Sequence, residues 1–166
     1  LQQQKLATLL MDLLTPAEER VDLQTRELRF DIEFLTERVA GAVDWAQKQP
    51  ELSQLKIGLF GASTGAAAAL KAAAARPDSV HAVVSRGGRP DLASDALPRV
   101  KAPTCLIVGE EDTPVIPLNQ SAYDAITVEK HLELVPGATH LFEEPGGLEA
   151  VSSHAQKWFL AHLGKK

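Results

Sequence analysis

The residue best suited to chemistry in this chain is Ser63, in the sequence GASTG at 61–65. An apolar stretch over 57–60 comes before it and an alanine-rich stretch comes after it. This context predicts a strand, a tight turn and a helix beginning at Thr64. A serine at the tip of such a turn stands clear of the strand, and the two glycines leave room for a strained backbone. The pattern therefore predicts a serine nucleophile.

The rest of the chain must supply the elements that hold this serine. Apolar and amphipathic stretches predict strands over 5–14, 57–60, 80–85, 104–108 and 131–135, and helices over 30–49, 64–75, 117–127 and about 147–163. Residues 15–27 are charged without a clear period, and we expect a loop or a loose helical turn there. The alternation predicts a single α/β domain over 1–166, with a mainly parallel, doubly wound sheet covered on both faces.

Two more reactive side chains follow predicted strands. Ligands of open parallel sheets bind beyond the carboxyl ends of the strands, and Asp112 and His140 both fall there. The other four histidines lie inside predicted strands or the last helix, so His140 is the expected general base. Asp112 is the expected acid beside it. Nearby acids are rivals for that role: Glu110, Glu111 and Asp91.

Ser63, Asp112 and His140 would together form a catalytic triad. A serine is a weak nucleophile at neutral pH and needs a base. His140 would take the serine proton and later deliver it to the leaving group, while Asp112 would fix the imidazole tautomer and stabilise the imidazolium. The chain order Ser, Asp, His is the order found in α/β-hydrolases.

Two arginines follow the strand predicted over 80–85. Arg86 and Arg89 flank a pair of glycines, and arginine forks match carboxylate or phosphate groups. We expect one of them to hold an anionic part of the substrate, the alternative being plain surface charge. The acidic pair Glu143 and Glu144 is expected to lie in a solvated loop.

Composition narrows the function further. The 166 residues carry a net charge of −5 without a basic stripe, which argues against nucleic acid. No apolar run approaches the roughly 20 residues that span a bilayer, and no signal peptide is visible. The single cysteine, Cys105, is expected to be a core thiol in a reducing, cytoplasmic compartment. No cluster has metal-ligand spacing, and we expect no cofactor.

Several segments resemble the dienelactone hydrolase-like group of the α/β-hydrolase superfamily: GLFGASTGAAAAL, SRGGRPDL, APTCLIVGEEDTPVI and GATHLFEEPG. The resemblance covers nearly the whole chain. It implies the triad Ser63, Asp112 and His140, with the Thr64 backbone N–H as one oxyanion donor. It also implies hydrolysis of a small ester or lactone without a cofactor.

The chain departs from that family in two ways. Dienelactone hydrolases proper carry cysteine at the position of Ser63, so a general carboxylic ester is the safer substrate. In the family fold the serine follows the fifth of eight strands, and here only the stretch 5–14 precedes it, resembling the fourth. We therefore expect an N-terminally truncated sheet without a lid, lacking the loop after the third strand that supplies the second oxyanion N–H.

Two other functions remain open. The spacing of Gly58, Gly61 and Gly65 resembles a dinucleotide-binding loop. That motif requires an acidic residue about 20 positions further along the chain, and this sequence has Ser85 and Arg86 there. The second alternative is a catalytically impaired hydrolase fragment that serves as a scaffold. An exposed sheet edge would then favour homodimers.

Overall fold

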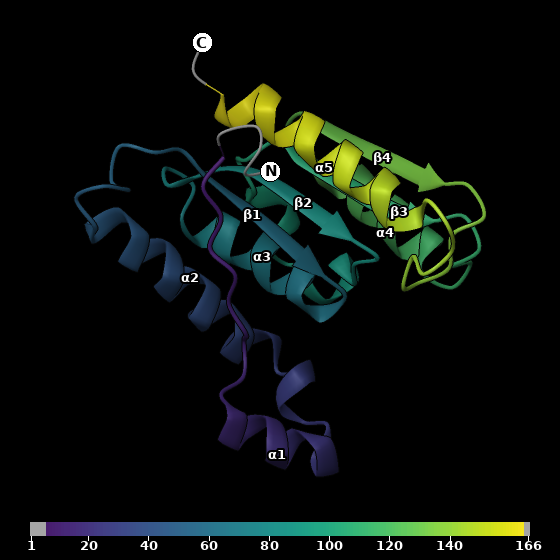
Figure 1. Ribbon diagram of the computed structural model, residues 1–166, viewed down its shortest axis with the longest axis horizontal. Coiled ribbons are helices and arrows are strands. Elements are labelled where there is room, and N and C mark those ends of the chain that lie inside the picture. The colour runs from purple at the N-terminus through teal and green to yellow at the C-terminus, as the bar shows by residue number, and fades with distance from the viewer. Residues whose placement is uncertain (1–5, 165–166) are drawn as a thin grey trace.

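Four parallel strands form the sheet in the computed structural model, which describes residues 6–164. The strands are β1 (Ile57–Ala62), β2 (Val80–Arg86), β3 (Thr104–Gly109) and β4 (Lys130–Val135), and they lie side by side in sequence order (Figure 1). Ala62 pairs with Arg86, and Arg86 with Ile107. The carboxyl ends of the strands therefore share one edge, as the sequence predicted.

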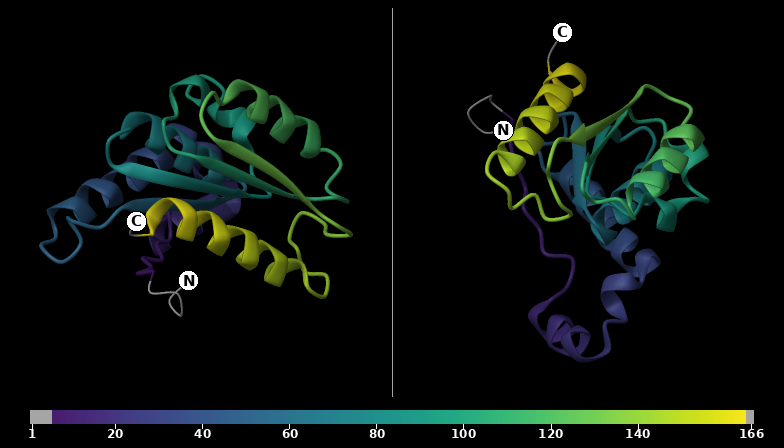
Figure 2. Two further views of the ribbon diagram at one scale, coloured as in Figure 1. Left: turned by 90° about the horizontal axis from the view of Figure 1, so that it is seen from above. Right: turned by 90° about the vertical axis from the view of Figure 1, so that its right-hand side faces the viewer.

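Helices cover both faces of the sheet. The helices are α1 (Pro16–Thr25), which lies away from the sheet, and α2 (Ile32–Lys48), α3 (Thr64–Ala75), α4 (Ile116–Ala125) and α5 (Gly147–Leu163). Helices α3 and α4 lie on one face and α5 lies on the other (Figure 2). Short 3₁₀ helices at Pro90–Ala93 and Leu97–Arg99 connect β2 to β3, without a lid. The doubly wound α/β class is confirmed.

The small side chains of α3 bring it against the sheet. Ala66, Ala67, Ala68, Ala69 and Leu70 are at most 2% exposed. Four of them, Ala67 to Leu70, form one apolar core with residues of α2 and β2. A second core on the opposite face joins Phe142 and α5 to the sheet.

The strand predicted over 5–14 is wrong for its described part, 6–14, and Lys5 lies outside the described residues. Leu6 packs against the core on the α5 side of the sheet, whereas Leu13 and Leu14 pack against the core on the other side. The segment thus passes the edge of β1 from one layer to the other (Figure 1). A strand is defined by hydrogen bonds to a neighbour, and among the described residues β1 pairs only with β2.

The loop or loose turn expected over 15–27 is a full helix, α1. Thr15 N donates to Glu18 Oε2 over 2.7 Å, and Glu18 N donates to Thr15 Oγ1 over 3.3 Å. This capping box is visible in the sequence as Thr-Pro-Ala-Glu. Because α1 lies away from the sheet (Figure 1), its sequence lacks the periodic apolar face that predicts a helix.

A buried carboxylate ties α1 to the 3₁₀ helix at Leu28–Phe30. Asp22 is 1% exposed and accepts hydrogen bonds from Arg29 N over 2.9 Å and from Arg29 Nε over 2.5 Å. Burial disfavours the charged carboxylate, but the hydrogen bonds and positive charge of Arg29 outweigh it and hold the pKa of Asp22 below its usual value.

We predict that Asp22→Asn lowers the melting temperature by several degrees at pH 7, because it weakens this anchor. Because the pKa of Asp22 is lower in the folded state, its ionised form stabilises the folded protein at pH values above the unfolded-state pKa of 3.8. This stabilisation is lost as pH falls through the folded-state pKa. The difference from wild type should therefore shrink below pH 3.8 in melts followed by circular dichroism. Asp78→Asn, at an exposed site, is the control. An equal effect of both variants would contradict the anchor.

Candidate active site

Ser63 sits at the tight turn between β1 and α3. Its φ of 50° and ψ of −123° are a strained combination for a residue other than glycine. A Cβ on Gly61 would lie 2.4 Å from the Gly65 carbonyl oxygen, so only glycine fits there. The Ser63 N–H donates to the Arg86 carbonyl over 3.3 Å, which fixes the turn to the end of β2. The turn predicted at 61–65 is confirmed.

Asp112 and His140 come together from two different loops. His140 Nδ1 lies 2.7 Å from Asp112 Oδ2. The Asp112 side chain is 8% exposed and that of His140 is 41% exposed. The carboxylate is therefore sheltered while the imidazole reaches the surface, and the bond from Nδ1 leaves Nε2 to act on another group.

The rival acids have other partners or positions. Glu110 accepts a hydrogen bond from Gly137 N over 3.1 Å, and Asp91 binds Arg89. Glu111 is exposed, and its backbone N–H donates to the Ala138 carbonyl over 3.0 Å. Asp112 is thus the predicted acid that the structure places on His140.

His140 also lies near the strand that holds the serine turn. A Cβ on Gly87, whose φ is +49°, would be 3.1 Å from the His140 carbonyl oxygen and 3.5 Å from its Nδ1. Gly87 directly follows Arg86, which accepts the Ser63 N–H. Ser63 and His140 thus occupy the same sheet edge, although no hydrogen bond joins Ser63 Oγ to His140 among the described residues. Catalytic hydrogen bonds often tighten only with substrate in place.

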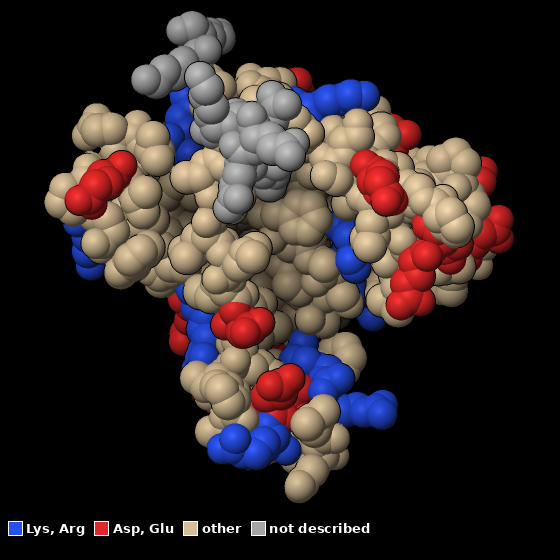
Figure 3. Space-filling view, in the orientation of Figure 1, with Lys and Arg blue, Asp and Glu red and all other residues tan. Residues whose placement is uncertain are grey.

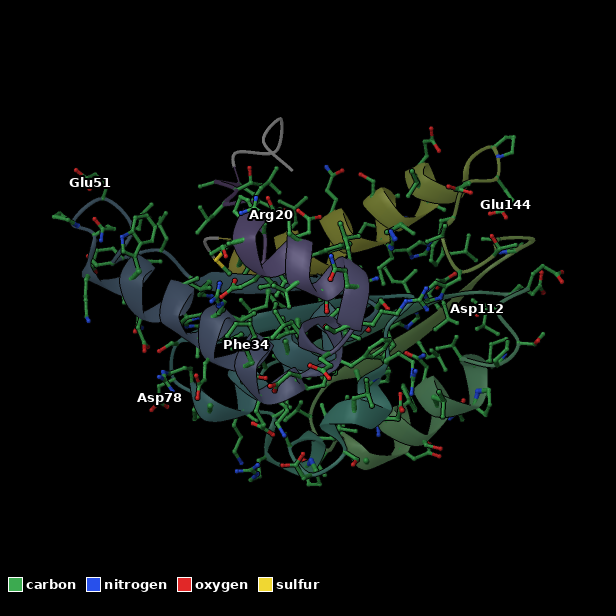
Figure 4. The ribbon with its side chains drawn as sticks, turned by 90° about the horizontal axis from the view of Figure 1, so that it is seen from below. Arg20, Phe34, Glu51, Asp78, Asp112 and Glu144 are labelled. Atoms are coloured by element: carbon green, nitrogen blue, oxygen red, sulfur yellow. The ribbon has the colours of Figure 1, made fainter. Side chains whose placement is uncertain are left out.

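Glu144 braces the His140 loop, a role that the sequence did not indicate. Its carboxylate accepts from Thr139 N over 3.1 Å and from Thr139 Oγ1 over 2.5 Å. The Thr139 hydroxyl, followed by backbone hydrogen bonds, lowers the pKa of Glu144. Figure 4 shows Glu144 at the same end of the molecule as Asp112. Glu144 lies in a loop, as expected, but its hydrogen bonds to Thr139 were not predicted from the sequence.

The two arginines differ in what they can still bind. Arg89 Nε and Nη2 donate to the two Asp91 carboxylate oxygens over 2.9 and 2.8 Å, which raises the pKa of Arg89. The Arg86 guanidinium lies over the Phe142 ring, 5.5 Å from its centre. Arg86 Nε is buried without a hydrogen-bond partner. Of the two arginines, Arg86 is therefore the one with an unsatisfied donor.

Other chemistries have little support in residues 6–164. Cys105 is buried in β3, and burial together with the charge of Glu133 raises the pKa of its thiol to about 12. No group of three or more His, Cys, Asp or Glu in this range is placed to hold a metal ion. Within the same range, no helix is long and apolar enough to cross a membrane.

A cleft of about 300 Å³ opens beside the serine turn, and the sequence analysis did not find it. Thr64 forms part of its wall, and the other walls come from the N-terminal segment, α1, α2 and the residues between these helices. The lining residues are Asp12, Leu13, Leu14, Pro16, Glu19, Arg29, Leu35 and Thr64. The capping box at the start of α1 could have predicted this helix from the sequence, and with it one wall of the cleft.

The fold and this site define an α/β-hydrolase. A model of the dienelactone hydrolase family matches residues 12–162, and the chain belongs to that family. The crystal structure of a dienelactone hydrolase from Anabaena variabilis superposes with a TM-score of 0.95 at 59% identity, over 98% of this chain and 75% of that chain. Est1E from Butyrivibrio proteoclasticus, solved with ferulic acid, shares the fold at 16% identity, with a TM-score of 0.71 over 81% of this chain and 70% of its own. The resemblance seen in the sequence is confirmed.

Curated relatives carry a different name. Two Mycobacterium tuberculosis proteins, each called "Putative phosphoribosyl transferase", are 56% identical to this chain over 157 residues. The match covers 95% of this chain but only 34% of either relative. The chain thus spans about a third of the length of the curated relatives that it matches.

We predict that Gly109→Ala destabilises the fold by about 1–3 kcal/mol, as overpacking does. A Cβ there would lie 2.2 Å from the Ala138 carbonyl oxygen and 2.6 Å from that of Thr139. Urea unfolding measures the change. Gly41→Ala in α2 is the control, because nothing lies within 4 Å of its added Cβ and alanine favours a helix by up to about 1 kcal/mol. No loss at Gly109 would contradict the close approach.

We also predict that Glu144→Gln loosens the His140 loop, because Thr139 loses a charged acceptor. Hydrogen exchange of the Thr139 amide should be faster than in wild type at pH 7. The lowered pKa of Glu144 stabilises the loop above the unfolded value of 4.5, so the difference should begin to shrink below pH 4.5 and disappear as pH falls through the lower folded-state pKa. Exposed Glu143→Gln is the control. Unchanged Thr139 exchange in the Glu144 variant would contradict the brace.

Proposed function

We propose that this chain carries the catalytic serine, histidine and aspartate of a hydrolase that cleaves a small carboxylic ester or lactone. The observation that carries the proposal is the 2.7 Å contact between Asp112 and His140 at the sheet edge where Ser63 stands in its strained turn. Membership of the dienelactone hydrolase family supports hydrolysis as the reaction class.

The first half of the reaction forms an acyl-enzyme. Ser63 Oγ attacks the ester carbonyl carbon while His140 Nε2 takes the serine proton. Asp112, bound to Nδ1, holds the tautomer that leaves Nε2 basic and stabilises the imidazolium. His140 then gives the proton to the leaving alkoxide as the carbon–oxygen bond breaks. In a lactone the released alcohol stays attached to the acyl group.

The second half consumes water. His140 takes a proton from water, and the hydroxide oxygen bonds to the acyl carbon. When the bond to Ser63 Oγ breaks, His140 returns the proton to that oxygen and the carboxylic acid leaves. Protons and bonds balance in both halves of the proposed reaction.

The oxyanion requires hydrogen-bond donors. Thr64 is the first residue of α3, so its N–H has no acceptor within the helix and lies at the positive end of the dipole. We assign it as one oxyanion donor. α/β-Hydrolases take a second N–H from a loop that follows an earlier strand, and residues 6–164 contain no strand before β1. Loss of one donor costs about 10²–10³ in rate.

Arg86 supports a substrate with an anionic group. Its guanidinium charge beside Phe142 favours a carboxylate or phosphate on the His140 side of the serine. Arg89 is a weaker candidate because Asp91 already occupies its guanidinium.

A second candidate function is that of a catalytically impaired scaffold. The edge of β1 without a neighbouring strand in the described chain and the exposed Leu9, Leu10 and Met11 favour association with another copy.

Phosphoribosyl transfer has less support, because about two-thirds of the length of the relatives that bear that name lies outside the match. The sole cysteine of the sequence favours the cytoplasm.

Covalent labelling with a nitrophenyl methylphosphonate tests the proposal. Ser63 Oγ would displace nitrophenolate from phosphorus, and His140 would take the serine proton. We predict labelling of Ser63 that Ser63→Ala abolishes and that Asp112→Asn slows by up to about 10⁴. His131→Asn, at an exposed residue of β4, should label like wild type. No labelling of a folded chain, or labelling that persists in Ser63→Ala, would contradict the proposal.

A further inference from the structure

We propose that the cleft beside Thr64 is the acyl pocket of this site and that it admits short uncharged acyl groups while rejecting anionic ones. This inference rests on the function proposed above and deepens it. Here the cleft residues are the eight that line it, from Asp12 to Thr64.

Position identifies the acyl side. His140 must protonate the leaving group, so the leaving group lies toward His140. Among the described residues, His140 lies beside Gly87, near Phe142 on the α5 side of the sheet. The cleft contains no residue of the His140 loop, and its Leu13, Leu14 and Leu35 belong to the core on the opposite face. A group in the cleft is therefore on the other side of Ser63 from the leaving group.

Proximity links the cleft to the reacting carbon. Thr64, whose N–H would bind the oxyanion, is itself part of the wall. Leu13 Cδ1 lies 3.7 Å from where a Cβ on Gly65 would be. The floor of the cleft is thus within one or two residues of the nucleophile. Its volume of about 300 Å³ is at the lower end for small-molecule sites, which suits a short chain or one ring.

Charge sets the preference. The cleft holds two carboxylates, Asp12 and Glu19, and one guanidinium, Arg29. Arg29 already donates to the buried Asp22 through Nε and through its backbone N–H, so its charge is largely compensated there. An added anion would face a surplus of negative charge. Figure 3 shows acidic and basic residues mixed around α1, next to a largely uncharged hollow over the sheet.

The test compares three nitrophenyl phosphonates that differ only in the group on phosphorus: methyl, butyl and carboxypropyl. Wild type should label about tenfold faster with butyl than with carboxypropyl. The double variant Asp12→Asn with Glu19→Gln should reduce this ratio toward the small intrinsic difference, and Leu14→Trp should slow butyl labelling while sparing methyl. Faster labelling by carboxypropyl in wild type, or no effect of Leu14→Trp on butyl, would overturn the inference.

A matched control separates local from overall charge. Glu51 and Asp78 lie at the end of the molecule opposite Asp112 (Figure 4) and do not line the cleft, so Asp78→Asn with Glu51→Gln makes the same charge change outside the cleft. This control should keep the wild-type ratio, and an equal fall would overturn the assignment to the cleft. The methyl probe distinguishes the two proposals: if it labels Ser63, the hydrolase proposal stands whatever the ratio, and if no probe labels Ser63, both proposals fail.

Discussion

The site depends on the close approach of backbone segments at the carboxyl edge of the sheet. Gly61 lets the first turn of α3 come against β1, and Gly109 lets residues 138 and 139 come against β3. Gly87 accommodates His140 through a positive φ. A Cβ at either of the first two positions would collide with backbone, which cannot move away as a side chain can. The 2.7 Å contact between His140 and Asp112 is therefore a consequence of packing that only glycine permits.

The edge of β1 that has no neighbouring strand among the described residues explains the irregular segment 6–14 and the position of α1. With β2 on one side and no strand on the other within the described chain, the segment 6–14 has no ladder to join. Its side chains pack at both ends, while Leu10 between them is 93% exposed. Helix α1 stands away from the sheet as a result, and the Asp22–Arg29 pair replaces the apolar contacts that usually dock a helix.

The sequence predicted well wherever local pattern and burial agree. The strands around Ser63, the thin helix α3 and the amphipathic α5 all follow from periodicity, because each buries a face that the pattern marks. The segment 6–14 failed because an apolar run becomes a strand only beside another strand. The structure places Asp112, the acid expected from the sequence, beside His140. Its position relative to Glu110 depends on loop register, which no single sequence shows. Glu144 escaped notice because its partner, Thr139, is revealed only by the fold.

The two sides of Ser63 differ in charge, and this difference bears on how a substrate would be oriented. On the α5 side, the Arg86 guanidinium lies beside Phe142, and its Nε is buried without a hydrogen-bond partner. On the other side, the cleft carries Asp12 and Glu19, and its one cation is held by a buried carboxylate. A small ester with an anionic leaving group and an uncharged acyl group satisfies both sides, whereas the reversed arrangement places like charges together. The Asp22–Arg29 pair thus anchors α1 and also compensates the one positive charge in the lining of the cleft.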